Sequence, residues 1–451
     1  MTRVLAFALL VGCYHPNEVG GVPCATNGEC PAGQSCDHTH TPAVCVAPGM
    51  LLPDAPPADA APACSVASPC DLSSAAPICD AMKHTCRGCV ADVDCGSYGV
   101  CTEYDGRCVA DADVIYVSTD TGAADACNAM TCCTATAPCA TLAFALMQLT
   151  ATRRTVRVGA GAYLATGMPL LAVTATDGRI VLSGEQLDWT GTSLANGGGY
   201  AGDAIVTATG SDVVIEGAAI TSPNDCVNAG GALILSHVDL ERCHNGVSAN
   251  QGGQLHVWAS RIANNNGQGI AVNGPGMFTG VPLDVQRTAF IANNQNAINS
   301  KLPVSIVNSI FAANNSNNVI NLQNAPASSI VSCTFSGNPK LPVVFADASV
   351  TSLTIDDSIF FANGGTSTSP PITCNAANAC AIDFSLFGAT APAGYRNIVG
   401  DPLFVDAATN DFHLLSGSPA IRTGDPNSAV MIDFDGNARA SPPDIGAFEA
   451  P

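Results

Sequence analysis

Positive charge is scarce in this chain of 451 residues. Lysine and arginine together number 16 against 37 acidic residues, which leaves a formal net charge of −21. Nucleic-acid binding depends on neutralising phosphates, so this balance argues against a nucleic-acid partner. The only lysines are Lys83, Lys301 and Lys340, too few to build a polybasic patch for an anionic membrane surface.

Aromatic residues and long apolar runs are also few. Aromatics make up 5% of the chain and charged residues 12%, while glycine reaches 43 and proline 29. So few aromatics argue against a typical helical core. Beyond the first dozen residues, no apolar run is as long as a membrane-spanning helix.

Cysteine, by contrast, is abundant and unevenly placed. Seventeen of the 22 cysteines lie in the first 139 residues. Such density predicts an oxidising compartment and a disulfide scaffold. The alternative is zinc, but Cys86 and Cys89 form the only C-x2-C pair, with no second pair at a zinc-ribbon distance.

The first residues predict export. Arg3 precedes a short apolar stretch, as in a secretory signal peptide. The end of that stretch, Leu10-Val11-Gly12-Cys13, resembles a bacterial lipobox. This resemblance implies cleavage after residues 1–12, lipidation of Cys13 and a membrane partner reached through the N-terminal lipid. An ordinary signal peptide with a coincidental cysteine is the alternative.

Residues 13–110 are predicted to form small disulfide-rich modules joined by a Pro/Ala-rich linker at 47–63. The spacings recur in three groups of four, each too short to bury a core without disulfides. Sequence alone leaves three pairings open in each group. The groups resemble the short Cys-rich repeats of bacterial surface lipoproteins. The candidates for disulfides, including four in a following loop and two further on, are Cys24, Cys30, Cys36, Cys45, Cys64, Cys70, Cys79, Cys86, Cys89, Cys95, Cys101, Cys108, Cys127, Cys132, Cys133, Cys139, Cys226 and Cys243.

A different pattern covers residues 111–400. A strand is expected at 115–118, and a helix carrying Leu142, Leu146 and Leu149 follows it. Then one phrase recurs: apolar-x-apolar-x-x-small-x-apolar-x-x-Asn. Its anchor residue steps along the chain by 20 to 28 residues, which is the period of a solenoid. The anchors are Ile220, Leu240, Ile262, Phe290, Phe311, Phe335, Phe360 and Phe387.

Stacked coils place equivalent residues in columns. We expect an asparagine ladder and an aliphatic stack, whereas an antiparallel sandwich would not keep the asparagines in phase. The pattern resembles the pectate-lyase-like superfamily and predicts an all-β fold, a right-handed parallel β-helix of eight or more coils. The expected ladder is Asn265, Asn293, Asn314, Asn338 and Asn363, and the stack is Leu235, Val257, Val285, Ile306, Ile330 and Ile355.

The columns also account for the later cysteines. Cys333 falls in a column of small inward residues, so we expect a buried free thiol. Cys226 and Cys243 are about one coil apart and are expected to form a bridge. Cys374 and Cys380 are a further candidate pair.

Residues 401–451 resemble the C-terminal segment of the choice-of-anchor Q family of bacterial surface proteins, from Asp401-Pro-Leu-Phe-Val to Pro443-Asp-Ile-Gly-Ala-Phe-Glu449. The chain ends at Pro451 without the sorting anchor that often follows in that family, which favours attachment by lipid at the other end. Asp433, Asp435 and Asn437 alternate in a Gly-containing loop that could supply oxygen ligands to a structural Ca²⁺. A turn in which these side chains cap local backbone is the alternative. No other cofactor is expected.

Two functions remain open. The polygalacturonase-like acidic motifs are absent, and Asp239 and Arg261 are expected to form a cross-coil ion pair, so we favour a non-catalytic binding, adhesion or structural protein. We place it at the outer membrane or cell surface of a Gram-negative bacterium. The alternative is a polysaccharide lyase or hydrolase. Ile310, Ile359 and Phe361 are predicted to form an outward apolar stripe that binds a surface glycan or protein, unless the insertion 364–379 covers it.

Overall fold

The computed structural model describes two compact units, one of Met1–Pro69 with Cys79–Cys86 and one of Cys70–Ile78 with Arg87–Pro451. Each is considered by itself. The residues described are 35–37, 44–46, 70, 76–80, 85–120, 123, 125, 132–165, 168–174, 178–185, 189–196, 201–249, 254–273, 283–364, 370–376 and 379–451. Cys13 and the predicted linker at 47–63 lie outside them.

The described residues of the cysteine-rich region form three two-stranded sheets. β1 (Ser35–Asp37) pairs antiparallel with β2 (Val44–Val46), and β3 (Ile78–Asp80) forms a sheet with β4 (Thr85–Arg87). In the second unit, β5 (Gly99–Thr102) pairs antiparallel with β6 (Arg107–Ala110). The third group of cysteines, with α1 (Asp92–Cys95) and this hairpin, is called the third module below. It belongs to the same compact unit as the solenoid.

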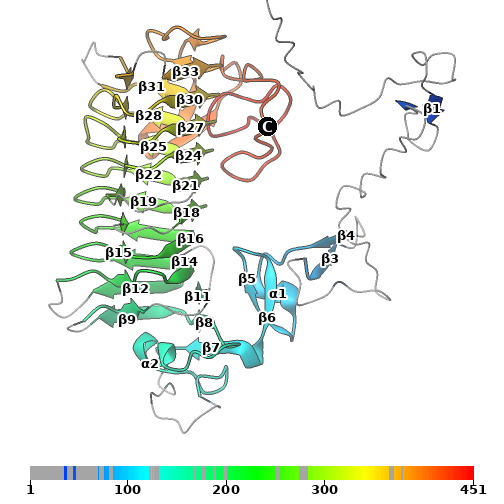
Figure 1. Ribbon diagram of the computed structural model, residues 1–451, viewed down its shortest axis with the longest axis vertical. Helices are drawn as coiled ribbons and strands as arrows, with labels where there is room; N and C mark the ends of the chain where they lie inside the picture. Colours follow the sequence, from blue (N-terminus) through cyan, green and yellow to red (C-terminus); the bar gives the residue numbers. More distant parts are fainter. Residues whose placement is uncertain are drawn as a thin grey trace, which may run out of the picture. The chain divides into compact units, whose positions relative to one another are not determined.

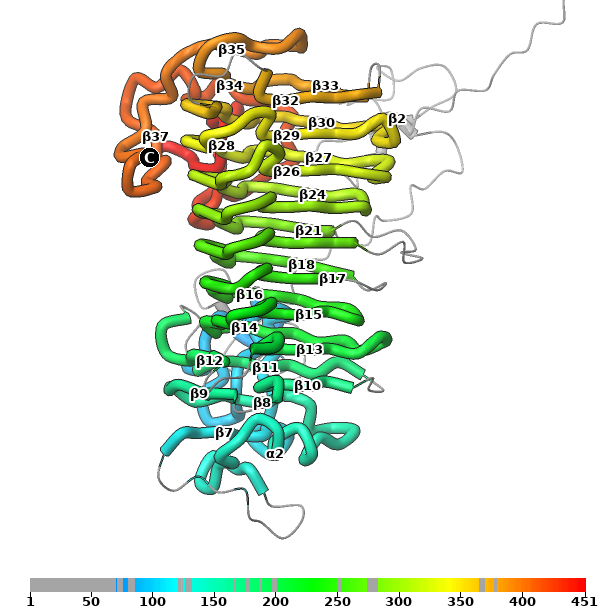
Figure 2. The backbone as a smooth tube through the Cα atoms, turned by 90° about the vertical axis from the view of Figure 1, so that its left-hand side faces the viewer, coloured from blue at the N-terminus to red at the C-terminus, as the bar shows by residue number. Residues whose placement is uncertain are grey.

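The solenoid consists of three columns of parallel strands, seen as stacked arrows and tubes in Figures 1 and 2. The first column is β8 (Thr155–Val158), β11 (Ile180–Gly184), β14 (Asp212–Thr221), β16 (Ala232–Glu241), β18 (Leu255–Trp258), β21 (Leu283–Gln286), β24 (Val304–Val307), β27 (Ala327–Val331), β30 (Ser352–Asp356) and β33 (Cys380–Asp383).

The second column follows the first around a bend. It contains β9 (Gly161–Ala165), β12 (Thr192–Asn196), the later halves of β14 and β16, β19 (Arg261–Ala263), β22 (Ala289–Ile291), β25 (Ile310–Ala312), β28 (Thr334–Ser336), β31 (Ile359–Phe361), β34 (Leu386–Phe387) and β35 (Ile398–Val399).

The third column closes each coil with a strand of three residues. It contains β10 (Leu171–Val173), β13 (Ile205–Thr207), β15 (Val227–Ala229), β17 (Val247–Ala249), β20 (Ile270–Val272), β23 (Ile298–Ser300), β26 (Ile320–Leu322), β29 (Val344–Ala346) and β32 (Ile372–Cys374). Nine strands in this order make nine coils among the described residues. The fold is therefore a right-handed parallel β-helix, as predicted, and parallel pairing throughout the solenoid excludes the sandwich.

The bend between the first and second columns has a local cause. One residue per coil adopts a left-handed backbone, which turns the strand within the two-residue break of the repeated phrase. The residues at this corner have φ between 45° and 52° and are His237, Ala259, Arg287, Asn308, Ser332, Asp357 and Phe384.

The predicted columns are confirmed in the core. Val257, Val285 and Ile306 are register partners in successive coils and are buried. The anchor phenylalanines stack in one row: the rings of Phe311 and Phe335 have centroids 4.7 Å apart at an interplanar angle of 7°. Pairing strand on strand thus aligns both the backbone ladders and the side chains that fill the interior.

The asparagine ladder and the free thiol are also confirmed. Asn314 donates its Nδ2 to the carbonyl of Phe290 at 2.9 Å and to Asn338 Oδ1 at 3.3 Å. Cys333 is unbridged and fully buried, and its amide donates to Ser358 Oγ at 3.1 Å. Burial raises the pKa of the Cys333 thiol to about 12, so the thiol stays protonated and inert.

A cap closes the first coil. β7 (Val114–Val117) pairs parallel with β8, and α2 (Leu142–Leu146) lies across the end of the stack in Figure 2. A short 3-10 turn, Asp111–Asp113, precedes β7. Leu142 and Ala145 are buried in the solenoid core, which shields its first coil from water. Among the described residues, no helix is long and apolar enough to cross a membrane.

The C-terminal segment folds back onto the second column. It contains the antiparallel pair β36 (Phe404–Asp406) and β37 (Asp411–Leu414), joined by the 3-10 turn Ala407–Thr409. Ile310 packs with Phe412 and Phe448, and only 4% of its surface is exposed. The apolar outward residues are therefore covered by this chain's own C-terminus.

This covering corrects the predicted docking stripe. Ile359 packs with Leu414 and Ile445 and is 1% exposed, while the half-buried Phe361 ring meets Phe404 edge-on at 6.0 Å. The prediction that Ile310, Ile359 and Phe361 bind a partner is thus wrong. Residues 370–376, the main described part of the insertion 364–379, form β32 of the third column and do not lie on the stripe.

Candidate functional site

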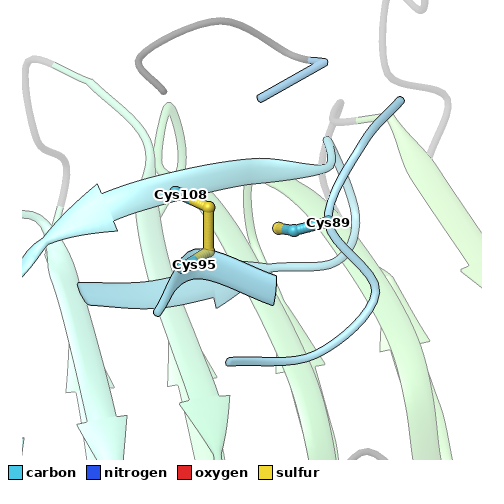
Figure 3. A group of neighbouring side chains, drawn as sticks. All are labelled: Cys89, Cys95 and Cys108. Atoms are coloured by element: carbon cyan, nitrogen blue, oxygen red, sulfur yellow. A yellow bond between two sulfur atoms is a disulfide. The ribbon is translucent and has the colours of Figure 1, made fainter. Parts of the chain in front are cut away.

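The disulfides bear directly on the zinc alternative. In the third module Cys89 pairs with Cys101 and Cys95 with Cys108. The sulfurs of Cys89, Cys95 and Cys108 lie within 4.8 Å of one another, but all belong to bridges, and Figure 3 shows the Cys95–Cys108 bond beside Cys89. Bridged sulfur is a poor metal ligand, since zinc binds the thiolate. This cluster is structural.

Further bridges join Cys133 to Cys139, Cys226 to Cys243 and Cys374 to Cys380. The predicted Cys226–Cys243 and Cys374–Cys380 pairs are present. Cys70, Cys79, Cys86 and Cys132 are disulfide-bonded as well. The remaining candidates, for which the structure describes no side chain, are Cys24, Cys30, Cys36, Cys45, Cys64 and Cys127.

The candidate binding surface lies on the outward side of the first two columns, at β16, β18, β19 and β21. Strands bury every second residue, so the alternate ones line up outside. Ser236, Trp258 and Gln286 are register partners in one outward row. A parallel row holds His256 and Asp284, and the row beyond the bend holds Asp239 and Arg261. We call Trp258, His256, Asp284, Gln286 and Arg287 the Trp258 strip.

Trp258 is the centre of this strip. Its half-buried indole meets the His237 ring edge-on, with centroids 5.4 Å apart, and the Arg287 guanidinium lies 5.9 Å from its centroid. Arg287 Nε donates to the carbonyl of Phe434 in the C-terminal segment at 2.8 Å. A cation over one side and a ring at the edge hold the indole in place, while part of it faces solvent.

Polar groups flank the indole within two strands. His256 Nδ1 lies 3.3 Å from Asp284 Oδ2, and Gln286 Nε2 donates to the same oxygen at 3.0 Å. Gln286 is exposed. An aromatic face beside carboxylate, imidazole and amide groups offers both an apolar platform and hydrogen bonds to a ligand.

The ion pair predicted between Asp239 and Arg261 is confirmed. Arg261 Nη1 lies 2.8 Å from both Asp239 oxygens and 3.3 Å from Glu241 Oε2. Burial raises the pKa of Asp239, and the positive charge of Arg261 opposes this rise. Arg261 is thus neutralised by two carboxylates and is not available to abstract a proton, and the carboxylates are not available to hold a cation.

Asp356 and Asp357 stand at the same corner nearer the C-terminal end of the solenoid. Burial raises their pKa values to about 7 and about 6, and for Asp356 repulsion from Asp357 and Asp425 adds to the effect. Asp357 is fully buried, and its Oδ1 accepts from the Asp425 amide at 2.7 Å. Asp357 therefore fastens the C-terminal segment to the solenoid.

The loop predicted to bind Ca²⁺ has the geometry of a capped turn. Asp433 is fully buried; its Oδ1 accepts from the amide of Asn437 at 2.7 Å, and its Oδ2 accepts from that of Glu449 at 3.0 Å. Asp435 points elsewhere, to His413 Nε2 at 2.8 Å. These contacts satisfy the carboxylates without a cation, and Ca²⁺ at this loop stays a prediction.

Sequence reasoning missed an array of amides on the third column. Asn321 Nδ2 donates to Asn299 Oδ1 at 2.9 Å in the preceding coil, and Asn299 lies 3.5 Å from Gln268 Oε1. Nearer the start, Asn228 donates to Asp203 at 2.9 Å. The middle residue of each three-residue strand points outward. Asparagine at this position in several coils is the sequence signal that could have predicted the array.

Comparison with known proteins finds a likeness among solved structures. No family model and no curated protein matches the chain. Among solved structures, the crystal structure of pectate lyase Pel9A matches with a TM-score of 0.48 and 13% identity, covering 75% of this chain and 96% of that one. Such a likeness concerns the fold alone.

Proposed function

We propose that this protein is a lipid-anchored cell-surface β-helix protein that binds a neutral glycan on the Trp258 strip without cleaving it. The observation that carries the proposal is the half-buried Trp258 indole, fixed between His237 and Arg287 beside Asp284 and Gln286. The apolar face of a sugar ring stacks on an indole, and the hydroxyl groups at its edge bond to carboxylate and amide groups.

Charge favours a neutral ligand. The chain carries a net charge of −21, which repels uronic-acid polymers and other polyanions. Binding without cleavage is favoured because Arg261 is held by Asp239 and Glu241 and Asp284 is held by His256 and Gln286. General acid–base catalysis needs a group free to exchange a proton with the substrate.

The surface location rests on indirect support. The disulfides of the third module and solenoid fit an oxidising compartment. The lipobox-like sequence ending in Cys13 supports a lipid anchor, and the choice-of-anchor Q resemblance of residues 401–451 supports exposure on the surface of a Gram-negative bacterium.

The test is binding of soluble neutral β-glucan oligosaccharides and of oligogalacturonates, measured by calorimetry. We expect the neutral ligand to bind and Trp258→Ala to weaken it at least about tenfold, or ~1.4 kcal/mol. Trp189→Phe, at the other tryptophan and outside the strip, is the matched control. Unsaturated or new reducing ends after incubation would instead establish the lyase or hydrolase alternative, and equal binding by Trp258→Ala would remove the strip as the site.

A further inference from the structure

A buried glutamate lies between the solenoid and the third module. Glu216 is on the outward side of β14, the side that faces solvent elsewhere, yet none of its surface is exposed. Its Oε2 accepts from the backbone amide of Tyr104 in the module at 3.3 Å. Its Oε1 is buried without a hydrogen-bond partner. An ionised carboxylate in this position is costly.

The nearest cation is already shared. Arg157 of β8 donates to Ser183 Oγ at 2.7 Å and to the Glu185 carbonyl at 2.9 Å, and it forms an ion pair with Asp92 of the third module. The positive charge of Arg157 therefore interacts with the Asp92 carboxylate as well as with Glu216.

The module also brings a second acid to this contact. Glu103 Oε2 lies 2.8 Å from His237 Nδ1, and the Glu103 charge repels that of Glu216. The other charged groups around the module's contact are Arg179, 5.4 Å from the Tyr104 ring, with its partner Asp212, and Asp105.

These surroundings set the direction of the pH effect. Burial, and then repulsion from Glu103, raise the pKa of Glu216 from 4.5 to about 7. Hydrogen bonds from Ser183 and the Tyr104 amide and the charge of Arg157 act in the opposite direction. When the module leaves, Glu216 returns to water and its pKa falls to the ordinary value. The covered state therefore binds the extra proton, and covering weakens as pH rises from about 4.5 through about 7.

We propose that the third module is a pH-sensitive cover on the outward face of β8, β11 and β14, held down in acid and released above neutral pH. The switch consists of Glu216 with Glu103 across the contact. Release uncovers Ser183 and Glu216 and frees Ser236, the register neighbour of Trp258. The third module and the strands that it covers belong to one chain, so this pH effect does not depend on glycan binding.

Hydrogen exchange of the full chain tests the cover directly. The readout is the protection of the Tyr104 amide, which donates to Glu216, after correction for the intrinsic pH dependence of exchange. The Cys101 amide, which donates to Asp92 Oδ1 at 2.9 Å inside the module, is the internal reference. Between about pH 4.5 and pH 8, we expect Tyr104 protection to fall by up to about a hundredfold while Cys101 changes little.

Glu216→Gln mimics the protonated acid and should keep Tyr104 protected at both pH values. Glu103→Gln removes the repulsion from the module's side, which lowers the pKa of Glu216, and should shift the loss of protection to lower pH without abolishing the cover. Glu185→Gln, an exposed acid in the preceding coil, should behave as wild type. Equal Tyr104 protection in acid and base for the wild type, or an unchanged pH dependence in Glu216→Gln, would overturn the proposal. If Glu216→Gln does not fold, the wild-type and Glu103→Gln profiles decide.

Discussion

The side-chain amide of Asn293 donates to the carboxamide oxygen of Asn314 at 3.0 Å, and Asn314 stands in the same relation to Asn338 one coil further on. Each asparagine thereby satisfies its neighbour and also the buried carbonyl of a second-column strand. Replacing one asparagine of this ladder therefore leaves unpaired hydrogen-bonding groups in the coils on both sides.

Asn314→Ala should therefore be strongly destabilising. The Phe290 carbonyl, Asn338 Oδ1 and the Asn293 amide groups lose their partner inside the protein, for an expected loss of about 2–4 kcal/mol in the free energy of unfolding. Urea titration followed by circular dichroism measures it. Asn317→Ala, at an exposed asparagine of the same coil, should change stability by less than about 0.5 kcal/mol. Similar losses in both variants would contradict a structural role for the ladder.

The sequence predicts this ladder because repetition makes it visible. Asn265 and Asn293 occupy one position of a recurring phrase, and parallel stacking converts that position into contact. The cover over Ile310 has no such signal. Asn308 donates to the Ile432 carbonyl across 124 residues, and Arg439 reaches Asn308 across 131. These partners follow no period, so the sequence shows an outward apolar stripe without showing what lies on it.

The same limit applies to the candidate site. The cross-coil pair of Asp239 and Arg261 follows from register, and it was predicted. Trp258 gains its surroundings from His237, Glu103 of the third module and Phe434 of the C-terminal segment, which meet only in three dimensions. Composition can exclude classes of ligand, but it cannot predict which distant segments meet around Trp258.

Ile310→Asp should detach the C-terminal segment. The new carboxylate would be buried against the apolar side chains of Phe412 and Phe448, and such burial costs several kcal/mol. Limited proteolysis should then cleave within residues 401–451 much faster than in the wild type. The control is Ile432→Asp, because Ile432 is 41% exposed. Equal protease resistance of Ile310→Asp and wild type would show that the segment does not need this contact.

Gly446 provides a second test of the same contact. Its φ is +103°, and a Cβ there would lie 2.6 Å from Ile359 Cδ1, while Gly417, with φ +92°, has open space around its Cβ position. Both alanine variants carry backbone strain, but only Gly446→Ala adds a clash with the buried stripe. We expect Gly446→Ala to lower the melting temperature more than Gly417→Ala, by the equivalent of about 1–3 kcal/mol. Identical melting temperatures would remove close packing as the reason for glycine.

Cys13 carries the proposed lipid anchor. Metabolic labelling with a palmitate analogue in a Gram-negative host should mark the wild type, and Cys13→Ser should abolish both the label and membrane fractionation, since multiple acyl chains give stable anchoring. Cys333→Ser, which removes a buried free thiol, is the control and should keep the label. An unlabelled wild type would exclude the anchor.

The buried Asp357 predicts a stability that depends on pH. Burial raises its pKa from 3.8 to about 6, so the folded state holds a proton that the unfolded chain releases. Its contribution is fully present below about pH 4 and is lost as pH rises through about 6, where neighbouring Asp356, with a pKa of about 7, adds a loss of the same sign. Asp357→Asn keeps an oxygen that can accept from the Asp425 amide but cannot ionise. We expect it to be more stable than the wild type by about 1–3 kcal/mol near pH 8 and no more stable near pH 4.

Thermal melts of both proteins across this range measure the difference directly. Asp347→Asn is the control of opposite sign, because, against the effect of burial, hydrogen bonds from Ser349 lower the pKa of the partly exposed Asp347. That variant should lose a little stability at the higher pH. A difference between Asp357→Asn and wild type that stays constant with pH would mean that Asp357 is not the group whose protonation favours the folded state. A difference that grows with pH would assign the proton to the Asp357 carboxyl, which joins the solenoid to Asp425. The C-terminal segment would then be the first part to detach in alkaline solution.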